Sequence, residues 1–213
     1  MKRVIRRGVF ETNSSSMHSI VVTKENLIKN EDVYLWQGKL NLYNSDLEFD
    51  RSPFEILSTP KRKLCYAIAS ILPKSFYGHI TEDEDGVPVA DEYLVGKFDE
   101  FDQLASKLFD ECDGIDYPTE TKHNDKYEWD VPYCGYVDHD SDSLLTKFLD
   151  KEGITLYEFI SNPKYIVVID GDEYCVFNSM KEAHLINEEN IVKEMCDNGW
   201  GYEYTHKEDK DLW

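Results

Sequence analysis

An unusual combination of polar side chains stands near the start of the chain, between Arg6 and His18. Arg6 and Arg7 are followed by a carboxylate, hydroxyls and an amide, carried by Glu11, Thr12, Asn13, Ser14, Ser15 and Ser16. Hydroxyls, an amide and unpaired backbone N–H groups in a loop can surround an anion, and arginine adds a planar, bidentate cation. The pattern therefore predicts a site that binds a phosphate or a carboxylate.

His18 closes this segment and is its candidate catalytic residue. An imidazole titrates near neutral pH, so His18 could act as a general acid or base on a ligand that the loop holds. A purely structural interpretation stays open beside the functional one. Consecutive serines also form ordinary turns between strands, and a single histidine in such a turn is commonly solvated or hydrogen-bonded.

A second polar cluster follows a strand predicted at residues 133–137, and it consists of Asp138, His139, Asp140 and Ser141. His139 is a second candidate acid or base, because either neighbouring aspartate could orient its imidazole. If this turn and the His18 segment converge in space, they form one pocket with two histidines, arginines, serines and aspartates. The structural alternative is that these residues cap a helix N-terminus and interact with its dipole.

Neither cluster has the pattern of a metal site. The aspartates of the second cluster begin like a calcium-binding EF-hand loop, but Ser143 stands where that loop requires glycine. Leu149 stands where it requires glutamate, and leucine cannot coordinate a cation. We therefore expect neither a metal nor a cofactor.

The run from Arg7 to Ser19, RGVFETNSSSMHS, resembles the opening of a family of uncharacterised proteins from bacteriophages and low-GC Gram-positive bacteria. Members of that family begin with a VFETNSSSxHS signature. The resemblance implies a viral or mobile-element context and a functional loop, but it supplies no reaction. No GxSxG, HExxH, P-loop or GxGxxG motif occurs in the chain, so catalysis stays an open question.

The secondary structure predicted around these residues indicates an α+β fold. We expect one domain spanning 1–213, with a mixed or antiparallel sheet and packed helices. Strands are predicted at 2–10, 19–23, 33–36, 40–43, 165–169, 173–177 and 200–204. Helices are predicted at 60–72, 98–112, 141–149, after a capping box of Thr155 and Glu158, after Ser179, and at 188–197. We expect an acidic surface loop near 81–92 and an irregular polar segment near 113–130.

The composition is that of a globular protein with a strong negative charge. Of the 213 residues, 41% are hydrophobic, and 43 acidic against 23 basic residues give a net charge of −20. This charge repels phosphate backbones, so direct nucleic-acid binding is not expected. No run approaches the roughly 20 apolar residues of a membrane span, no secretory signal is recognisable, and the five cysteines are scattered without a CxxC pair. We expect a cytoplasmic protein without membrane contact.

These observations leave two main hypotheses of different classes. In the first, a phage-type accessory protein binds a nucleotide or another phosphorylated small molecule through the N-terminal Arg/Asn/Ser/His loop, with or without processing it. In the second, an acidic inhibitor imitates the charge of nucleic acid and blocks a basic host protein, such as a defence nuclease. A structural protein whose polar loop only fixes a turn is the third alternative.

Overall fold

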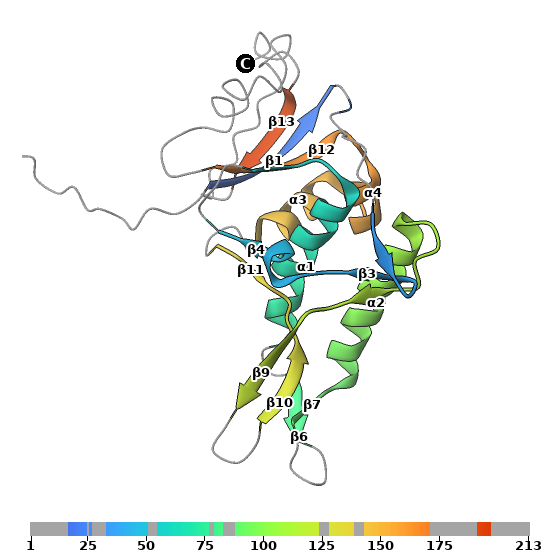
Figure 1. Ribbon diagram of the computed structural model, residues 1–213. Coiled ribbons are helices and arrows are strands. Elements are labelled where there is room, and N and C mark those ends of the chain that lie inside the picture. Colours follow the sequence, from blue (N-terminus) through green and yellow to red (C-terminus); the bar gives the residue numbers. More distant parts are fainter. Residues whose placement is uncertain are drawn as a thin grey trace, which may run out of the picture.

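A four-stranded antiparallel sheet holds the strand that follows the polar N-terminal segment (Figure 1). The computed structural model describes residues 17–24, 26, 33–50, 55–76, 79–82, 88–123, 128–138, 143–170 and 191–196. The strand order is β13–β1–β12–β5, formed by Met17–Thr23 (β1), Glu55–Leu57 (β5), Tyr165–Asp170 (β12) and Ile191–Cys196 (β13). β1 is therefore a central strand, bonded to β12 on one side and to β13 on the other.

Both faces of this sheet are apolar. On the helix side, Ile20, Leu57 and Val167 belong to the main core. On the opposite face, a separate buried cluster is formed by Val21, Ile166, Val168 and Ile191. A strand that is covered on both faces has a continuous run of apolar residues rather than alternating apolar and polar residues. β1 and β12 have such runs in their IVV and YIVVI segments.

Helix α1 (Pro60–Phe76) is the centre of the main core. Each residue from 63 to 70 is at most 3% exposed, so the helix is surrounded on all sides, unlike an amphipathic surface helix. Figure 1 shows α1 below the sheet with α3 (Leu144–Glu152) and α4 (Leu156–Ser161), while α2 (Glu92–Leu108) packs against α1 farther from the sheet. The buried stretch of α1 includes one charged residue, Lys63, which donates to backbone carbonyls where α4 ends.

Local sequence signals explain the ends of the peripheral helices. The capping box before α4 is confirmed: the Glu158 N–H donates to Thr155 Oγ1 at 3.2 Å, and the Thr155 N–H donates to Glu158 Oε2 at 2.7 Å. α2 begins after Asp91, whose carboxylate accepts the Leu94 N–H at 2.9 Å. α3 ends at Gly153, where a φ of 65° suits a residue without Cβ.

Short strands connect these elements. β2 (Leu35–Trp36), β3 (Lys39–Asn41) and β8 (Ile115–Asp116) form a three-stranded sheet, and η1 (Asn44–Asp46) follows β3. β4 (Glu48–Phe49) pairs in parallel with β11 (Tyr136–Val137). Two antiparallel pairs project at the foot of Figure 1, namely Ile80–Glu82 (β6) with Pro88–Ala90 (β7) and Thr119–His123 (β9) with Glu128–Pro132 (β10).

The α+β prediction is confirmed, but three local predictions are wrong. The helix predicted at 188–197 is strand β13 in the structure. The sequence IVKEMC has only a weak helical periodicity, and its hydrogen bonds to β1 stabilise the strand instead. The stretch 81–92 is no simple loop, since β6 and β7 pair within it. The segment 113–130 contains β8, β9 and part of β10, and the polar composition of β9 and β10 reflects their exposure to solvent.

Several predicted elements lie outside the described residues. These are the strands at 2–10, 173–177 and 200–204 and the helix after Ser179.

Candidate functional site

Two residues of the predicted sites, His18 and Asp138, lie in the part of the chain that the structure describes. The others lie outside the described residues: Arg6, Arg7, Glu11, Thr12, Asn13, Ser14, Ser15, Ser16, His139, Asp140 and Ser141. His18 follows the first polar run in the sequence and Asp138 is the first residue of the second cluster.

His18 is the second residue of β1 and faces the helices. Its side chain is fully buried, and its Nδ1 lies 3.2 Å from the hydroxyl oxygen of Tyr66 on α1. Which of these two atoms carries the shared hydrogen depends on the histidine tautomer. The imidazole is therefore not a solvated loop residue: it is held inside the protein by a hydrogen bond to a buried tyrosine, and the ring centroids of the two residues are 5.7 Å apart.

The surroundings of His18 favour its neutral form. Burial lowers the pKa of His18 from 6.5 to about 4, since a buried imidazolium loses its hydration, and the negative charge of Asp138 opposes this shift. At neutral pH the ring therefore acts as a hydrogen-bonding group with one N–H and one acceptor nitrogen. A general-acid role at neutral pH would require a bound anion that raises this pKa again.

Asp138, the first residue of the second cluster, lies near His18. It follows β11, is half-buried, and its backbone N–H donates to the carbonyl oxygen of Phe49 at 3.1 Å. Its carboxylate lies near enough to His18 to raise the histidine pKa. His139, the second candidate base, lies outside the described residues.

The parallel pair β4–β11 positions Asp138, and a glycine permits this pairing. Gly135 has a φ of 72°, and its α-carbon lies against Leu47, whose carbonyl oxygen accepts the Tyr136 N–H at 3.1 Å. A Cβ at position 135 would approach the Leu47 Cβ to 2.5 Å, closer than nonbonded carbons come. The two strands can therefore meet here only because residue 135 has no side chain.

A polar pocket of about 280 Å³ is lined by neighbours of the His18–Tyr66 pair, although His18, Tyr66 and Asp138 are not among its lining residues. Its polar lining consists of three carboxylates and two hydroxyls, and its apolar lining of Phe49 and Ile169; the polar residues are Ser45, Glu48, Asp50, Glu55 and Tyr136. Ile169 is the cross-strand partner of His18, and the Phe49 ring packs edge-on against Tyr66 with centroids 5.2 Å apart. The apolar wall of the pocket thus contacts the residues that surround His18.

Tyrosine hydroxyls contact two of these carboxylates. Tyr133 Oη donates to Glu48 Oε1 at 2.9 Å, and burial together with this bond raises the pKa of Tyr133. Tyr136 Oη lies 3.4 Å from Asp50 Oδ2, and its pKa is raised by burial and by nearby carboxylates. The carboxylates have further acceptor capacity, so the pocket is suited to a ligand that donates hydrogen bonds.

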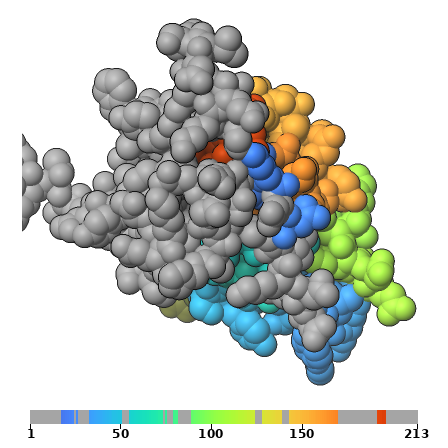
Figure 2. All heavy atoms as spheres, turned by 90° about the horizontal axis from the view of Figure 1, so that it is seen from above, coloured from blue at the N-terminus to red at the C-terminus, as the bar shows by residue number. Residues whose placement is uncertain are grey.

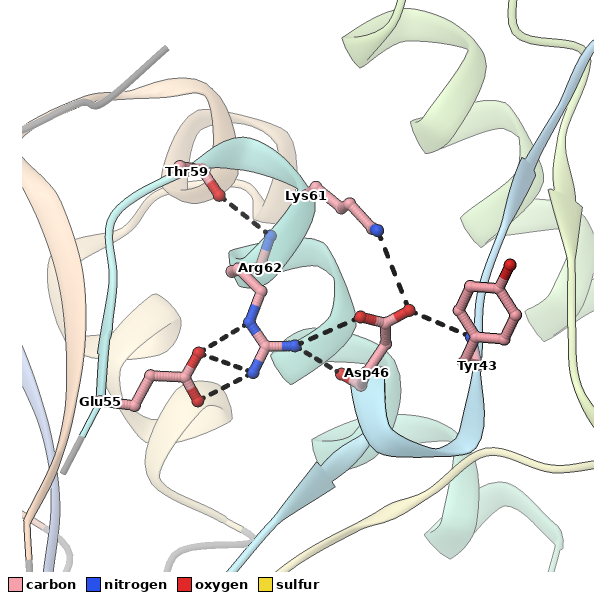
Figure 3. Close-up of polar contacts among 6 residues, drawn as sticks. All are labelled: Tyr43, Asp46, Glu55, Thr59, Lys61 and Arg62. Atoms are coloured by element: carbon pink, nitrogen blue, oxygen red, sulfur yellow. Dashed lines mark hydrogen bonds and ion pairs between the residues drawn. The ribbon is translucent and has the colours of Figure 1, made fainter. Parts of the chain in front are cut away.

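Arg62 at the start of α1 fixes the wall of the pocket (Figure 3). Its Nε and Nη2 donate to the two carboxylate oxygens of Glu55, each at 2.8 Å, and its Nη1 donates to the Asp46 carbonyl at 3.0 Å. The guanidinium carbon also lies 5.1 Å from the centre of the Phe49 ring. A bidentate ion pair and a cation–π contact together hold α1, η1, β4 and β5 in one arrangement.

Sequence reasoning missed Phe49, Arg62, Tyr66 and the pocket carboxylates. His18 and Tyr66 are 48 positions apart, and Glu48 and Tyr133 are 85 apart, so no local motif joins them. The sequence holds one weak indication of this site. Tyr66 is a hydroxyl-bearing residue within the apolar stretch of a predicted helix, and such a residue needs a buried hydrogen-bond partner.

Comparison with known proteins identifies no relative: no family model, no curated protein and no solved structure matches the chain. Within the described ranges, no helix is both long and apolar enough to cross a membrane. In the same part of the chain, no group of three or more histidine, cysteine, aspartate or glutamate side chains is arranged to hold a metal ion.

The buried state of His18 leads to a prediction about acid stability. Because its folded pKa is about 4 and its unfolded value is 6.5, the unfolded chain binds more protons between these values. We expect acidification from pH 6.5 to pH 4 to remove up to roughly 3 kcal/mol of stability relative to a His18→Leu variant. Urea unfolding of both proteins across this range measures the difference, and parallel curves for the two proteins would contradict it.

Proposed function

We propose that this protein is a phage-type accessory protein that binds a nucleotide or a similar phosphorylated small molecule where the His18 segment and the Asp138 turn meet. One observation carries the proposal: His18 and Asp138, far apart in the sequence, lie close enough for the Asp138 charge to act on the His18 imidazole, and a polar pocket is lined by residues that neighbour His18. The chemistry of the N-terminal run supports an anion-binding role for residues 6–18, and its resemblance supports the phage-type context.

The charges of the pocket and of the N-terminal loop assign different parts of the ligand to these two regions. Glu48, Asp50 and Glu55 in the pocket repel a phosphate, so we assign the phosphate to Arg6 and Arg7 and to the hydroxyl and amide groups of the N-terminal loop. Sugar hydroxyls and base amino groups are hydrogen-bond donors, and they suit the carboxylates of the pocket. Phe49 and Tyr136 supply apolar contact for a ring.

His18 has a supporting role in this arrangement. As a neutral, buried imidazole bonded to Tyr66, it holds the start of β1 in place. A phosphate bound nearby would favour the imidazolium and raise its pKa, because opposite charges stabilise each other.

The proposal predicts a selective thermal stabilisation. At about ten times Kd, a nucleoside monophosphate should raise the melting temperature by about 3–6 °C, whereas inorganic phosphate and the uncharged nucleoside should each have a smaller effect. Arg7→Ala should reduce the stabilisation by the phosphate, and Asp50→Asn the stabilisation by the nucleoside part. The measurement is a thermal-shift screen of mono-, di- and triphosphates on the full chain.

Two exposed residues of α3 provide matched controls. Lys147→Ala removes a positive charge as Arg7→Ala does, and Asp150→Asn removes a carboxylate as Asp50→Asn does. Both control variants should respond to the nucleotide as the wild type does. If no phosphorylated compound shifts the melting temperature of the wild type, the proposed function is wrong.

A further inference from the structure

Three large aromatic side chains are exposed to solvent on the β2–β3 ribbon and directly beside it. Tyr34 is 69% exposed, Trp36 53% and Tyr43 66%. The strand period places them together: Leu35, Leu40 and Leu42 pack on the core, so their neighbours in the chain face outward. Exposing aromatic side chains to water is unfavourable in free energy, and protein interaction surfaces are enriched in these side chains.

The ribbon is a rigid support for these rings. Its turn, Gln37–Gly38, has φ values of 51° and 79°, the two positive values of the tight turn that fits the twist of paired strands. Leu35 pairs with Leu40 and Trp36 with Lys39. Figure 2 shows the ribbon in mid-blue, projecting at the lower edge of the molecule.

Carboxylates border this aromatic face. The Asp113 carboxylate lies beside Gly38, where the Asp113 N–H donates to the Gly38 carbonyl at 2.7 Å. Asp116 on β8 accepts a hydrogen bond from Asn41 of β3 at 3.0 Å. Both aspartates are exposed, and the net charge of the chain is −20. Lys39, the cross-strand partner of Trp36, is an exposed cation on the same ribbon. The rings, the two carboxylates and the net negative charge of the chain together still attract cations and repel phosphates.

We propose that the Tyr34–Trp36–Tyr43 face, bordered by Asp113 and Asp116, is an interaction surface for a basic protein whose arginine side chains stack on the rings. Arginine fits both features, because its planar guanidinium stacks on aromatic faces and also pairs with carboxylates. Charge complementarity selects this partner over single-stranded nucleic acid, whose bases also stack on aromatic rings. The surface shares no residue with the pocket lining, and it gives the acidic-inhibitor hypothesis a specific location.

The test uses defined peptides and full-length variants of equal net charge. A fluorescent octa-arginine peptide, its octa-citrulline counterpart and an oligothymidine are titrated with wild type, with Tyr34→Ser/Trp36→Ser and with Tyr157→Ser. Tyr157 is a 43% exposed tyrosine on α4 and serves as the control. Titration in salt of about 0.15 M screens long-range attraction, which is the same in all three proteins.

We expect octa-arginine to bind wild type and Tyr157→Ser equally, and to bind the double variant about tenfold more weakly. Octa-citrulline should not bind, because it lacks the positive charge. Equal binding to wild type and the double variant would show that charge alone attracts the peptide, and would overturn the proposal. Absence of octa-arginine binding to wild type, or oligothymidine binding that the Tyr34→Ser/Trp36→Ser variant loses, would also overturn it. Circular dichroism melting confirms that each variant is folded.

Discussion

Replacement of Gly135 by alanine is expected to destabilise the protein by about 4 kcal/mol. Two costs combine at this position. A φ of 72° disfavours any residue with a Cβ, and the new methyl group would overlap the backbone of Leu47. To relieve the overlap, β11 must move away from β4, and the hydrogen bond from Tyr136 to Leu47 is lost. Chemical unfolding of wild type and variant measures the effect.

Gly153→Ala is the matched control for this substitution. Gly153 has a φ of 65°, similar to that of Gly135, but no atom lies within 4 Å of where its Cβ would be. This variant should lose only about 1–2 kcal/mol, the cost of the backbone conformation. The difference between the two variants isolates the close approach of β11 to Leu47. Equal losses would show that β11 moves without cost.

A folded Gly135→Ala protein would also test the candidate site. Asp138 and Tyr136 belong to the segment that must shift, so the pocket beside Phe49 should change shape. We expect nucleotide-dependent stabilisation to disappear in this variant and to persist in Gly153→Ala.

Lys63→Met is expected to cost about 4 kcal/mol near neutral pH. The Lys63 ammonium is fully buried and donates to the carbonyls of Phe159, Asn162 and Tyr165 at 3.1, 2.8 and 3.0 Å. Methionine fills a similar volume but leaves these three acceptors without the donor at the end of α4 and the start of β12. Denaturant unfolding measures the loss, and a change below about 1 kcal/mol would show that solvent replaces the amine.

The same residue predicts a pH dependence above neutrality. Burial lowers the pKa of Lys63 from 10.5 to about 7, so between these values the unfolded chain binds more protons than the folded one. Stability therefore rises with pH in this window, by at most about 1.4 kcal/mol per unit. The difference in unfolding free energy between wild type and Lys63→Met should grow from pH 7 to pH 10, because all other groups are common to both. A constant difference would mean that the carbonyls keep the amine charged.

The elements that could be predicted are those whose signals are local. Continuous apolar runs give β1 and β12, Pro60 marks the start of α1, and the Thr155–Glu158 box opens α4. β13 could not be recognised, since IVKEMC is a strand only because β1 offers it hydrogen bonds. β11 lies within the strand predicted at 133–137. Its parallel pairing with the two-residue strand β4 could not be predicted, because that pairing depends on the contact between Gly135 and Leu47.

The candidate site was predictable only in part for the same reason. His18 and Asp138 stand beside conspicuous polar runs, whereas the burial of His18 depends on Tyr66 from α1. Arg62 reads as one of several basic residues at a helix start, and its bidentate pairing with Glu55 follows from the tertiary fold. A histidine's titration is set by its three-dimensional surroundings, so the sequence could suggest an acid or base but not a pKa of about 4.

The strand order β13–β1–β12–β5 also determines when the protein can fold. β1 is made first on the ribosome, but both of its partners lie beyond residue 164, so it has no hydrogen-bonding neighbour until most of the chain has been synthesised. Pairings of such long sequence separation close large loops and form slowly. His18 therefore reaches Tyr66 late, and the nascent chain carries an unpaired, strongly apolar strand for most of its synthesis, a state in which the net charge of −20 limits aggregation.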